Sequence, residues 1–401
     1  MWLWFLILLA MPTVIALIGF IIGKGAKLTW KEFIVLELIM IVLIVAGLFS
    51  SRSGSMHDIE IWNGWIKHSE FYEEWDEEVS CSHEIECTHL DDDGDPIHSN
   101  DGYKHDYDID HHSPYWQFAT SNDEIIDVDS GYFNFLVGVF RNNEYVKISR
   151  LSKHYDGGPG NKYVTKYIIG QSEFIPTSTE HKFKNYIKAN PNTILRRIGQ
   201  GNKFDNLIPA YPRVKNRIEC DRFLPMGLQI SNGVNWNKKL SEINGRLGAK
   251  KQVNITIIVA NTADSSYIHA LEEKWLGGKK NDFVIIVGCT QYPKIDWVRM
   301  MSWSQSEDLK VELRDKIMDI SSLEKRDEIL ENVELYINQK FVRRKMADFE
   351  YLMAGWQPPV GTLLWLFVVG FVTSVGLTIY FYVADPFGDE NGGNYYRRSR
   401  Y

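Results

Sequence analysis

The feature that most constrains this chain is a set of three long apolar runs, two at its beginning and one near its end. The runs cover residues 1–23, 33–51 and 359–384, and Glu37 is the only charged residue within them. A helix needs roughly 20 apolar residues to cross the hydrocarbon core of a bilayer. The pattern therefore predicts an integral membrane protein with three transmembrane helices in contact with the lipid bilayer.

Basic residues beside the runs predict which way the protein faces. Lys24, Lys27 and Lys31 follow the first run, and three arginines lie in the tail at 385–401. Three crossings place these short segments on one side, which the positive-inside rule assigns to the cytoplasm. The large middle region is then expected to be extracytoplasmic, although Arg52 and the basic residues at 343–345 argue for the opposite orientation. A signal peptide is the alternative for the first run, but that run lacks a basic beginning and a small-residue cleavage site.

Two features inside the apolar runs depart from a plain apolar sequence. Glu37 lies near one end of the second run, where it is expected to reach lipid headgroups or to pair with Lys31. Gly370 and Ser374 form a small-xxx-small pair, a spacing that allows close helix packing. The third run is therefore where a protein partner or a second copy of the chain is expected to associate.

Charge divides the middle region. Residues 57–129 hold 22 Asp or Glu, two Lys and eight of the eleven histidines. An acidic surface repels nucleic acid and attracts cations or basic partners. No basic groove with interleaved aromatic residues is present, so nucleic-acid binding is not expected.

The fold class expected outside the membrane is α+β. The predicted segments are a transmembrane hairpin at 1–51, an acidic, His-rich and β-rich domain at 52–204, an α/β domain at 205–355, a transmembrane helix at 359–384 and a basic tail at 385–401.

In the β-rich part, a hairpin is expected from 116–120 and 125–128 around Ser121-Asn122-Asp123. Further strands are expected at 132–140 and 145–148, and a helix at 181–189 that Pro191 ends.

In the α/β part, helices are expected at 237–247, 265–275, 308–320 and 324–352. Continuous apolar stretches rich in β-branched residues predict buried strands at 253–260 and 282–287, with a third strand at 295–303. The order helix, strand, helix, strand, strand, helix predicts a layered sheet with parallel pairing at its centre.

Three stretches within 240–351 resemble the TPM-domain family: LSEINGRLGAKKQVNITIIVANTAD, HALEEKWLGGKKNDFVIIVGC and IDWVRM. Trp275, Gly277, Gly278, Asp282 and Arg299 are among the residues that match the family pattern. The resemblance implies an extracytoplasmic α/β domain beside transmembrane helices. The Gly-x-Gly that follows the Arg strand in the family is replaced here by Ser302-Trp303-Ser304.

Three other stretches, CSHEIEC, YWQFATSNDEIIDVD and HKFKNYIKAN, resemble parts of poorly characterised membrane proteins of large tailed phages. That resemblance implies a phage-encoded protein in the inner membrane of a bacterial host.

No cofactor is expected, but two clusters could hold a divalent metal such as zinc or calcium. The first is Cys81, His83, Cys87 and His89, whose thiolates and imidazoles are zinc ligands. A disulfide between the two cysteines, or unpaired thiols, are the alternatives. The second is Asp106, Asp108, Asp110 and His112, which would share one face of a strand. A solvated acidic loop is the alternative for this second cluster.

Some TPM-like domains are credited with metal-dependent phosphatase activity, and by position the candidate catalytic acids here are Asp264, Asp282 and Asp296. Each opens or follows a predicted strand. Helix capping and turn formation are the alternative roles for these acids.

A basic patch of Arg213, Lys215, Arg217 and Arg222 precedes the TPM-like part, and it is expected to dock onto the acidic 57–129 segment of the same chain. Binding of anionic lipid headgroups is the alternative.

The sequence therefore predicts a membrane-anchored interaction, assembly or envelope-modifying factor rather than an enzyme. A metal-dependent phosphohydrolase and a cation-sensing outer segment are the other hypotheses.

Overall fold

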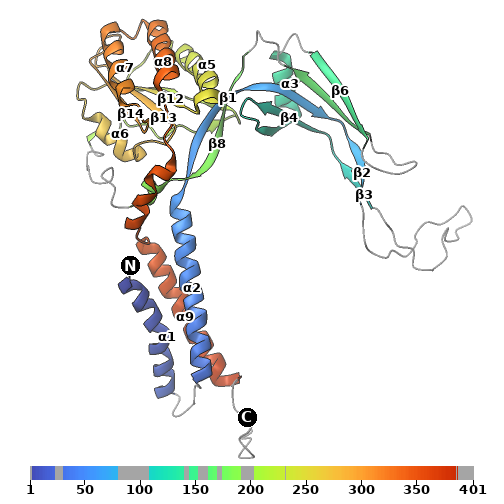
Figure 1. The fold of residues 1–401 in the computed structure, drawn as a ribbon, viewed down its shortest axis with the longest axis vertical. Coiled ribbons are helices and arrows are strands. Elements are labelled where there is room, and N and C mark those ends of the chain that lie inside the picture. Colours follow the sequence, from blue (N-terminus) through green and yellow to red (C-terminus); the bar gives the residue numbers. More distant parts are fainter. Residues whose placement is uncertain are drawn as a thin grey trace, which may run out of the picture. The chain divides into compact units, whose positions relative to one another are not determined.

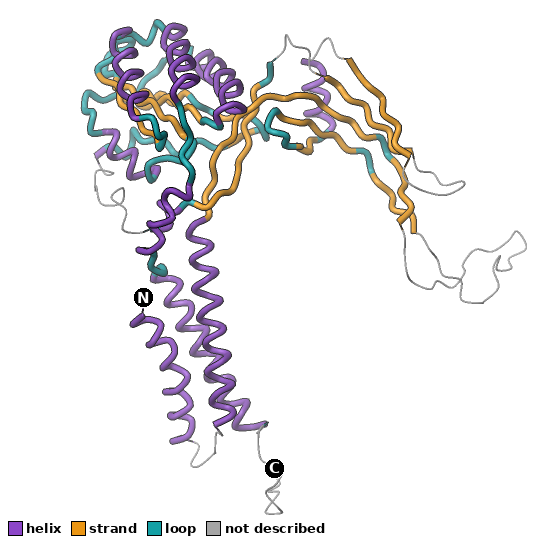
Figure 2. The backbone as a smooth tube through the Cα atoms, in the orientation of Figure 1, coloured by secondary structure: helices purple, strands orange, loops and turns teal. Residues whose placement is uncertain are grey.

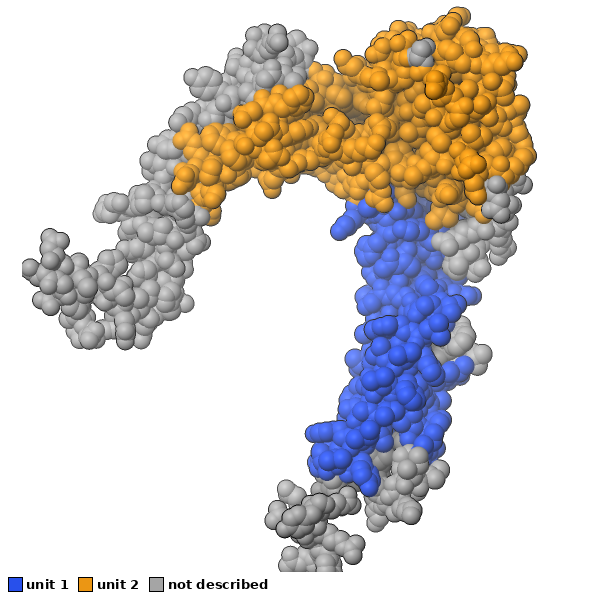
Figure 3. All heavy atoms as spheres, turned by 180° about the vertical axis from the view of Figure 1, so that it is seen from behind, with its two compact units in different colours: residues 1–59, 182–199, 345–401 blue, residues 60–181, 200–344 orange. Residues whose placement is uncertain are grey.

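The computed structural model describes residues 2–22, 30–79, 108–139, 144–151, 161–168, 174–190, 203–230, 232–384 and 386. The chain divides into two compact units (Figure 3). Unit 1 comprises residues 1–59, 182–199 and 345–401, and unit 2 comprises residues 60–181 and 200–344.

Unit 1 is built on three apolar helices (Figure 1). They are α1 (Trp2–Ile22), α2 (Trp30–Met56) and α9 (Val360–Ala384). Among the described residues, α2 and α9 are the helices that are long and apolar enough to cross a membrane, and only 17% of the most apolar stretch of each is buried. A core helix of a water-soluble domain would bury much more of its apolar surface. Two of the three expected spans are therefore observed as candidate spans.

Close packing holds the three helices together. Gly370 of α9 faces Met11 of α1 and Met40 of α2, and a Cβ atom at Gly370 would lie 2.7 and 2.8 Å from their methyl carbons. The hydroxyl of Thr13 donates a hydrogen bond of 2.7 Å to Glu37. Gly370 and Ser374 are both buried inside this bundle, so the predicted small-residue pair packs helices of one chain.

Two short helices complete unit 1 beside the end of α2. They are α4 (Tyr186–Ala189) and the 3₁₀ helix η3 (Met346–Gly355). Asn185 caps α4, because its side-chain oxygen accepts hydrogen bonds from the amides of Ile187 and Lys188 at 3.1 and 3.0 Å. The helix predicted at 181–189 is therefore wrong over its first four residues, which belong to a strand that pairs with another part of the chain.

A six-stranded sheet forms one part of unit 2 (Figure 2). Its order is β5-β4-β1-β7-β6, and β8 also pairs with β1. The strands are β1 (His57–Tyr72), β4 (Tyr115–Thr120), β5 (Ile125–Val128), β6 (Glu144–Leu151), β7 (Asn161–Ile168) and β8 (Pro176–Lys184). The hairpin predicted around residues 121–123 is confirmed as the antiparallel pair of β4 and β5.

The strand predicted at 132–140 is wrong, because this segment is helix α3 (Ser130–Val139). Its apolar and aromatic composition is typical of strands, but Phe133 and Leu136 are spaced as on a helix and enter the core of the sheet layer. The carboxylate of Asp129 accepts a hydrogen bond of 2.8 Å from the amide of Tyr132, which starts the helix.

The other part of unit 2 is an α/β module with a four-stranded sheet of order β11-β12-β13-β14. The strands are β11 (Phe223–Met226), β12 (Asn254–Ala260), β13 (Asp282–Gly288) and β14 (Trp297–Ser302). The helices are α5 (Gly233–Lys251), α6 (Tyr267–Trp275), α7 (Glu307–Ile320) and α8 (Arg326–Lys340). Parallel pairing at the centre is confirmed, and β14 runs antiparallel to β13.

Helices cover both faces of this module. Apolar residues of α5, α7 and α8 pack on one face, and those of α6 pack on the other. Every residue of β12 and β13 is buried, which explains why these strands have continuous apolar sequences. Two short pairings stand apart from both sheets: β9 (Val214–Lys215) with β10 (Glu219–Cys220), and β2 (Trp75–Val79) with β3 (Asp108–His112).

Strand β1 lies directly on helix α5 of the module. A Cβ atom at Gly248 would lie 2.4 Å from the carbonyl oxygen of Asn63, and one at Gly245 would lie 2.9 Å from that of Gly64. The two glycines are three residues apart and share one face of α5. They provide the space that the backbone of β1 occupies.

We expect Gly248→Ala to lower the free energy of unfolding by about 1–3 kcal/mol, because the methyl group would push against backbone that cannot move aside easily. Chemical denaturation of the full-length protein in detergent, followed by tryptophan fluorescence, measures the change. Gly233→Ala is the matched control on the same helix, since nothing lies within 4 Å of its Cβ position. Equal stability of the two variants would contradict this account of the contact.

Candidate functional site

Asn63 lies at a buried junction between β1, β8 and the α/β module. Its side-chain Nδ2 donates to the carbonyl oxygen of Val253 at 3.0 Å. Its Oδ1 accepts hydrogen bonds from the Ser178 hydroxyl at 3.0 Å and from Arg222 at 2.5 Å. Because Asn63 is only 1% exposed, these contacts replace water for both ends of its amide.

Arg222 is the polar group at this junction whose burial costs the most free energy of desolvation. It is 1% exposed, and the acceptors of its side-chain hydrogen bonds, Asn63 and the Ser178 hydroxyl at 2.9 Å, are both neutral. Within the described parts of the chain, its Nε and Nη1 atoms find no hydrogen-bond partner. A buried cation that is only partly satisfied is destabilising by itself. Its position beside β11 nevertheless ties that strand to β1 and β8.

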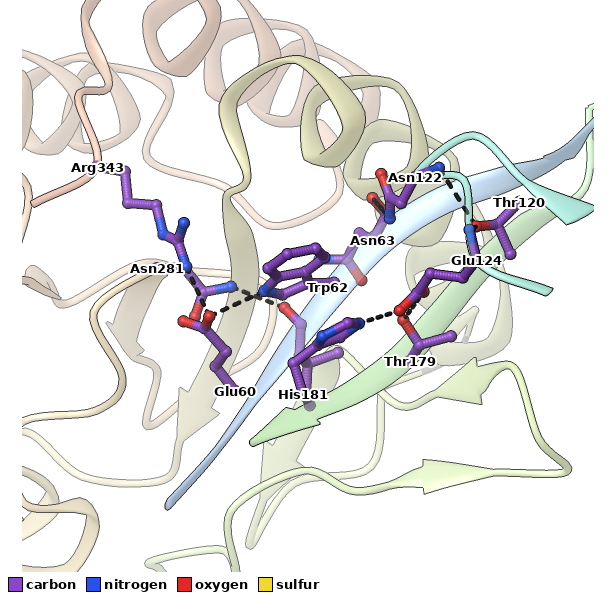
Figure 4. A network of polar contacts seen from close by, with 11 residues as sticks. Glu60, Trp62, Asn63, Thr120, Asn122, Glu124, Thr179, His181, Asn281 and Arg343 are labelled. Carbon is purple, nitrogen blue, oxygen red and sulfur yellow. Dashed lines mark hydrogen bonds and ion pairs between the residues drawn. The ribbon is translucent and has the colours of Figure 1, made fainter. Parts of the chain in front are cut away.

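Glu60 of β1 forms an ion pair with Arg343 (Figure 4). Its buried carboxylate accepts hydrogen bonds from Arg343 at 2.6 Å and from the indole of Trp62 at 2.9 Å. Lys280 lies 3.4 Å from the same oxygen. Burial lowers the pKa of Lys280, and the attraction of Glu60 opposes that shift. The segment that leaves α8 is thereby fastened to β1.

A histidine, a carboxylate and a hydroxyl meet on the partly buried side of β8 that carries Thr179 and His181 (Figure 4). His181 pairs with Glu124, and the Thr179 hydroxyl donates to Glu124 at 2.5 Å. The ring of His181 stacks on Trp62 with centroids 3.8 Å apart. A nucleophile activated by histidine would donate its proton to the imidazole. Here the hydroxyl donates to the carboxylate instead, so this group is arranged to hold β4, β5 and β8 together.

Asp282, the second predicted catalytic acid, is a buried structural group. It accepts hydrogen bonds from Asn254 at 2.7 Å, from the Tyr211 hydroxyl at 2.9 Å and from the amide of Lys279 at 2.6 Å. Burial raises the pKa of Asp282 to about 6, against the opposing effect of these donors. The carboxylate joins the beginnings of β12 and β13 to the turn after α6.

The other two predicted acids lie at the opposite edge of the sheet. Asp264 follows β12, pairs with Lys203 and accepts a hydrogen bond of 2.9 Å from the amide of Ser266. The hydrogen bond from Lys203 lowers the pKa of Asp264 to about 2. Asp296 precedes β14 and accepts hydrogen bonds of 2.7 Å from the amide and hydroxyl of Thr290. Both acids therefore stabilise turns.

The structure does not bring the three acids together. Asp282 pairs in register with Asn254 at the start of both parallel strands, whereas Gly288 at the far end pairs with Trp297, next to Asp296. Six residues of extended strand separate the two edges by about 20 Å. A shared metal for all three carboxylates does not fit this arrangement.

The predicted metal-binding residues lie largely outside the described residues. This holds for Cys81, His83, Cys87, His89 and Asp106.

Asp108, Asp110 and His112 lie in strand β3 and not in a loop, and their backbones pair with Val79, Glu77 and Trp75 of β2. In the part of the chain that is described, no group of three or more His, Cys, Asp or Glu side chains is placed to hold a metal ion.

The predicted docking of the basic patch onto residues 57–129 is confirmed for two residues, Arg222, which donates to Asn63 at 2.5 Å, and Arg217. Arg217 pairs with Asp129 at 3.0 Å and donates to the carbonyl oxygen of Asp127 at 2.6 Å, so it contacts the acidic segment. Lys215 pairs locally with Asp221 instead, at 2.6 Å.

Sequence reasoning missed the structural roles of Asn63, Arg222 and Glu60. The contacts that define the role of Asn63 join segments more than 100 residues apart, which no local sequence pattern reveals.

No protein-family profile, curated protein or solved structure matches this chain.

We expect Asp282 to make the folded state less stable as pH rises. Its folded pKa of about 6 lies above the value of 3.8 for an exposed Asp, so the folded state binds more protons between those values. The contribution of Asp282 to the free energy of unfolding is fully present below about pH 4, and it is lost as pH rises through about 6. The loss amounts to about 3 kcal/mol.

The measurement compares the free energy of unfolding of the wild type and of Asp282→Asn from pH 4 to pH 7. The difference isolates Asp282 from acids such as Asp308, whose lowered pKa of about 2 acts at more acidic pH. Parallel pH profiles for the two proteins would show that Asp282 does not titrate in this range.

Proposed function

We propose that this protein is an integral membrane protein whose extracytoplasmic region serves as an interaction or assembly factor, or modifies the cell envelope. In this proposal three helices anchor it, residues 52–355 lie outside the cytoplasm, and the α/β module is TPM-like. The proposed setting is the inner membrane of a bacterial host, with the protein encoded by a phage.

Exposed apolar surface supports the membrane anchor. Leu38, Val42 and Phe49 of α2 are 56%, 67% and 73% exposed. Val368 and Val372 of α9 are 58% and 63% exposed. Water would make such surfaces associate, whereas lipid tails solvate them. Helix α1 supports a third span, since Thr13 gives Glu37 a partner within the bundle.

The arrangement of polar groups favours a binding role over the alternative of a phosphohydrolase. Asp264, Asp282 and Asp296 each have structural partners, and Asp282 lies at the other edge of the sheet. A hydrolase of this kind needs acids that converge on one metal. This placement leaves the binding role as the better supported function.

The observation that carries the proposal is the edge of the six-stranded sheet. Strand β5 is a terminal strand in the sheet order, and its Ile125 is 65% exposed. Phe135 of α3, which packs in the same layer, is 64% exposed. An edge strand with an exposed apolar side chain offers both unpaired backbone groups and apolar area to another protein. We therefore place a protein partner at β5.

The test is site-specific photo-crosslinking in cells with a photoreactive amino acid at position 125. We expect one discrete adduct, because a partner strand paired with β5 would hold the same partner residues beside position 125. Val234, which is 83% exposed on α5, is the control position for random collisions. An adduct pattern at 125 that equals the pattern at 234 would reject β5 as an interface.

A further inference from the structure

The end of α2 that continues into β1 is surrounded by a compact group of residues. We call residues 52–58, 182–190 and 345–356 of unit 1 the collar. The amide of Asn185 donates to the carbonyl oxygen of Met56 at 2.7 Å, and Asn190 donates to that of Leu352 at 3.0 Å. An apolar cluster that includes Trp356 fills the centre of the collar. The collar therefore belongs to the same packed body as the apolar helices.

The collar carries more positive than negative charge. It contains five Lys or Arg and three Asp or Glu. One acid, Asp58, already pairs with Lys188 at 3.5 Å. The other four cations, Arg52, Lys182, Lys184 and Lys345, are exposed, and their side chains form no ion pair with another described residue. The collar also contains the exposed acids Asp348 and Glu350, so this end of the bundle presents an excess of two positive charges.

An apolar groove begins where the collar ends. It has a volume of about 440 Å³ and lies between α1 and α9. Ile7 and Leu8 line it from α1, Leu364 and Phe367 line it from α9, and Gln357, the residue after the collar, provides a polar group at its end. The volume is within the range of roughly 300–1,000 Å³ that is usual for small-molecule sites.

We propose that the groove and the collar together bind one anionic phospholipid, with an acyl chain between α1 and α9 and the phosphate at the collar cations. The inference rests on the proposed membrane anchoring. An apolar groove that faces lipid is filled by an acyl chain, and the excess of positive charge at its polar end favours a negatively charged headgroup over a neutral one. Tyr351 of the collar is 71% exposed, as expected for a side chain at the headgroup level.

The test measures the phospholipid that stays bound to the full-length protein. The protein is purified in detergent supplied with equal amounts of phosphatidylglycerol and phosphatidylcholine, and bound lipid is quantified by mass spectrometry. We expect the wild type to retain phosphatidylglycerol in preference. Replacing Lys182, Lys184 and Lys345 together by Gln should bring the ratio of the two lipids close to one, because each basic residue at the surface contributes about fivefold at low salt.

A matched variant controls for total charge. Lys238, Lys274 and Lys316 are exposed lysines on α5, α6 and α7, and replacing them by Gln changes the net charge by the same amount. Leu364→Trp fills the groove from a position that is 62% exposed, so we expect it to reduce retention of both lipids without unfolding the bundle. An unchanged lipid ratio in the collar variant, or an equal change in the control variant, would overturn the proposal.

Extraction with alkaline carbonate separates this inference from the anchor on which it depends. Release of the wild type from membranes would refute the proposed anchoring itself. Retention in the membrane without a preference for phosphatidylglycerol would refute only the lipid site.

Discussion

The contact of strand β1 with helix α5 is the constraint on which unit 2 depends. β1 supplies a central strand to the six-stranded sheet, and its residues 63 and 64 also lie against the backbone-sized space left by Gly245 and Gly248. Asn63 then connects this strand to β8 and to the start of β12. A side chain on either glycine would separate the two layers, because neither backbone can yield without losing hydrogen bonds.

Buried charged groups also hold β1 in place. Glu60 neutralises part of the charge of Arg343 and Lys280, whereas Arg222 is buried among neutral partners. Breaking one of these contacts would leave a charge in a medium that solvates it poorly, so removing a single partner is expected to destabilise the fold. Hydrogen bonds and ion pairs have preferred geometries, so these contacts fix the orientation of β1 more closely than apolar packing alone would.

The placement of the acids in the α/β module is the reason we propose a binding role for the protein instead of metal-dependent hydrolysis. Parallel strands bring their carboxyl ends to one edge, and an active site in such a sheet is expected there. Asp264 and Asp296 lie at that edge but hold turns, while Asp282 lies at the opposite edge and joins two strands. The exposed Ile125 on the edge strand β5 is where we propose contact with another protein.

Sequence pattern by itself determined the apolar helices, the buried strands β12 and β13, and the hairpin of β4 and β5, because these elements depend on local periodicity and turn residues. It did not determine α3 or β8. The apolar composition of residues 132–140 suits a strand, and only their packing with Asp129 as a cap makes them a helix. The roles of Asn63 and Arg222 were likewise decided by tertiary structure, because their partners lie far away in the sequence. The separation of Asp282 from Asp296 follows from strand direction and register, which set the two residues at opposite edges of one sheet.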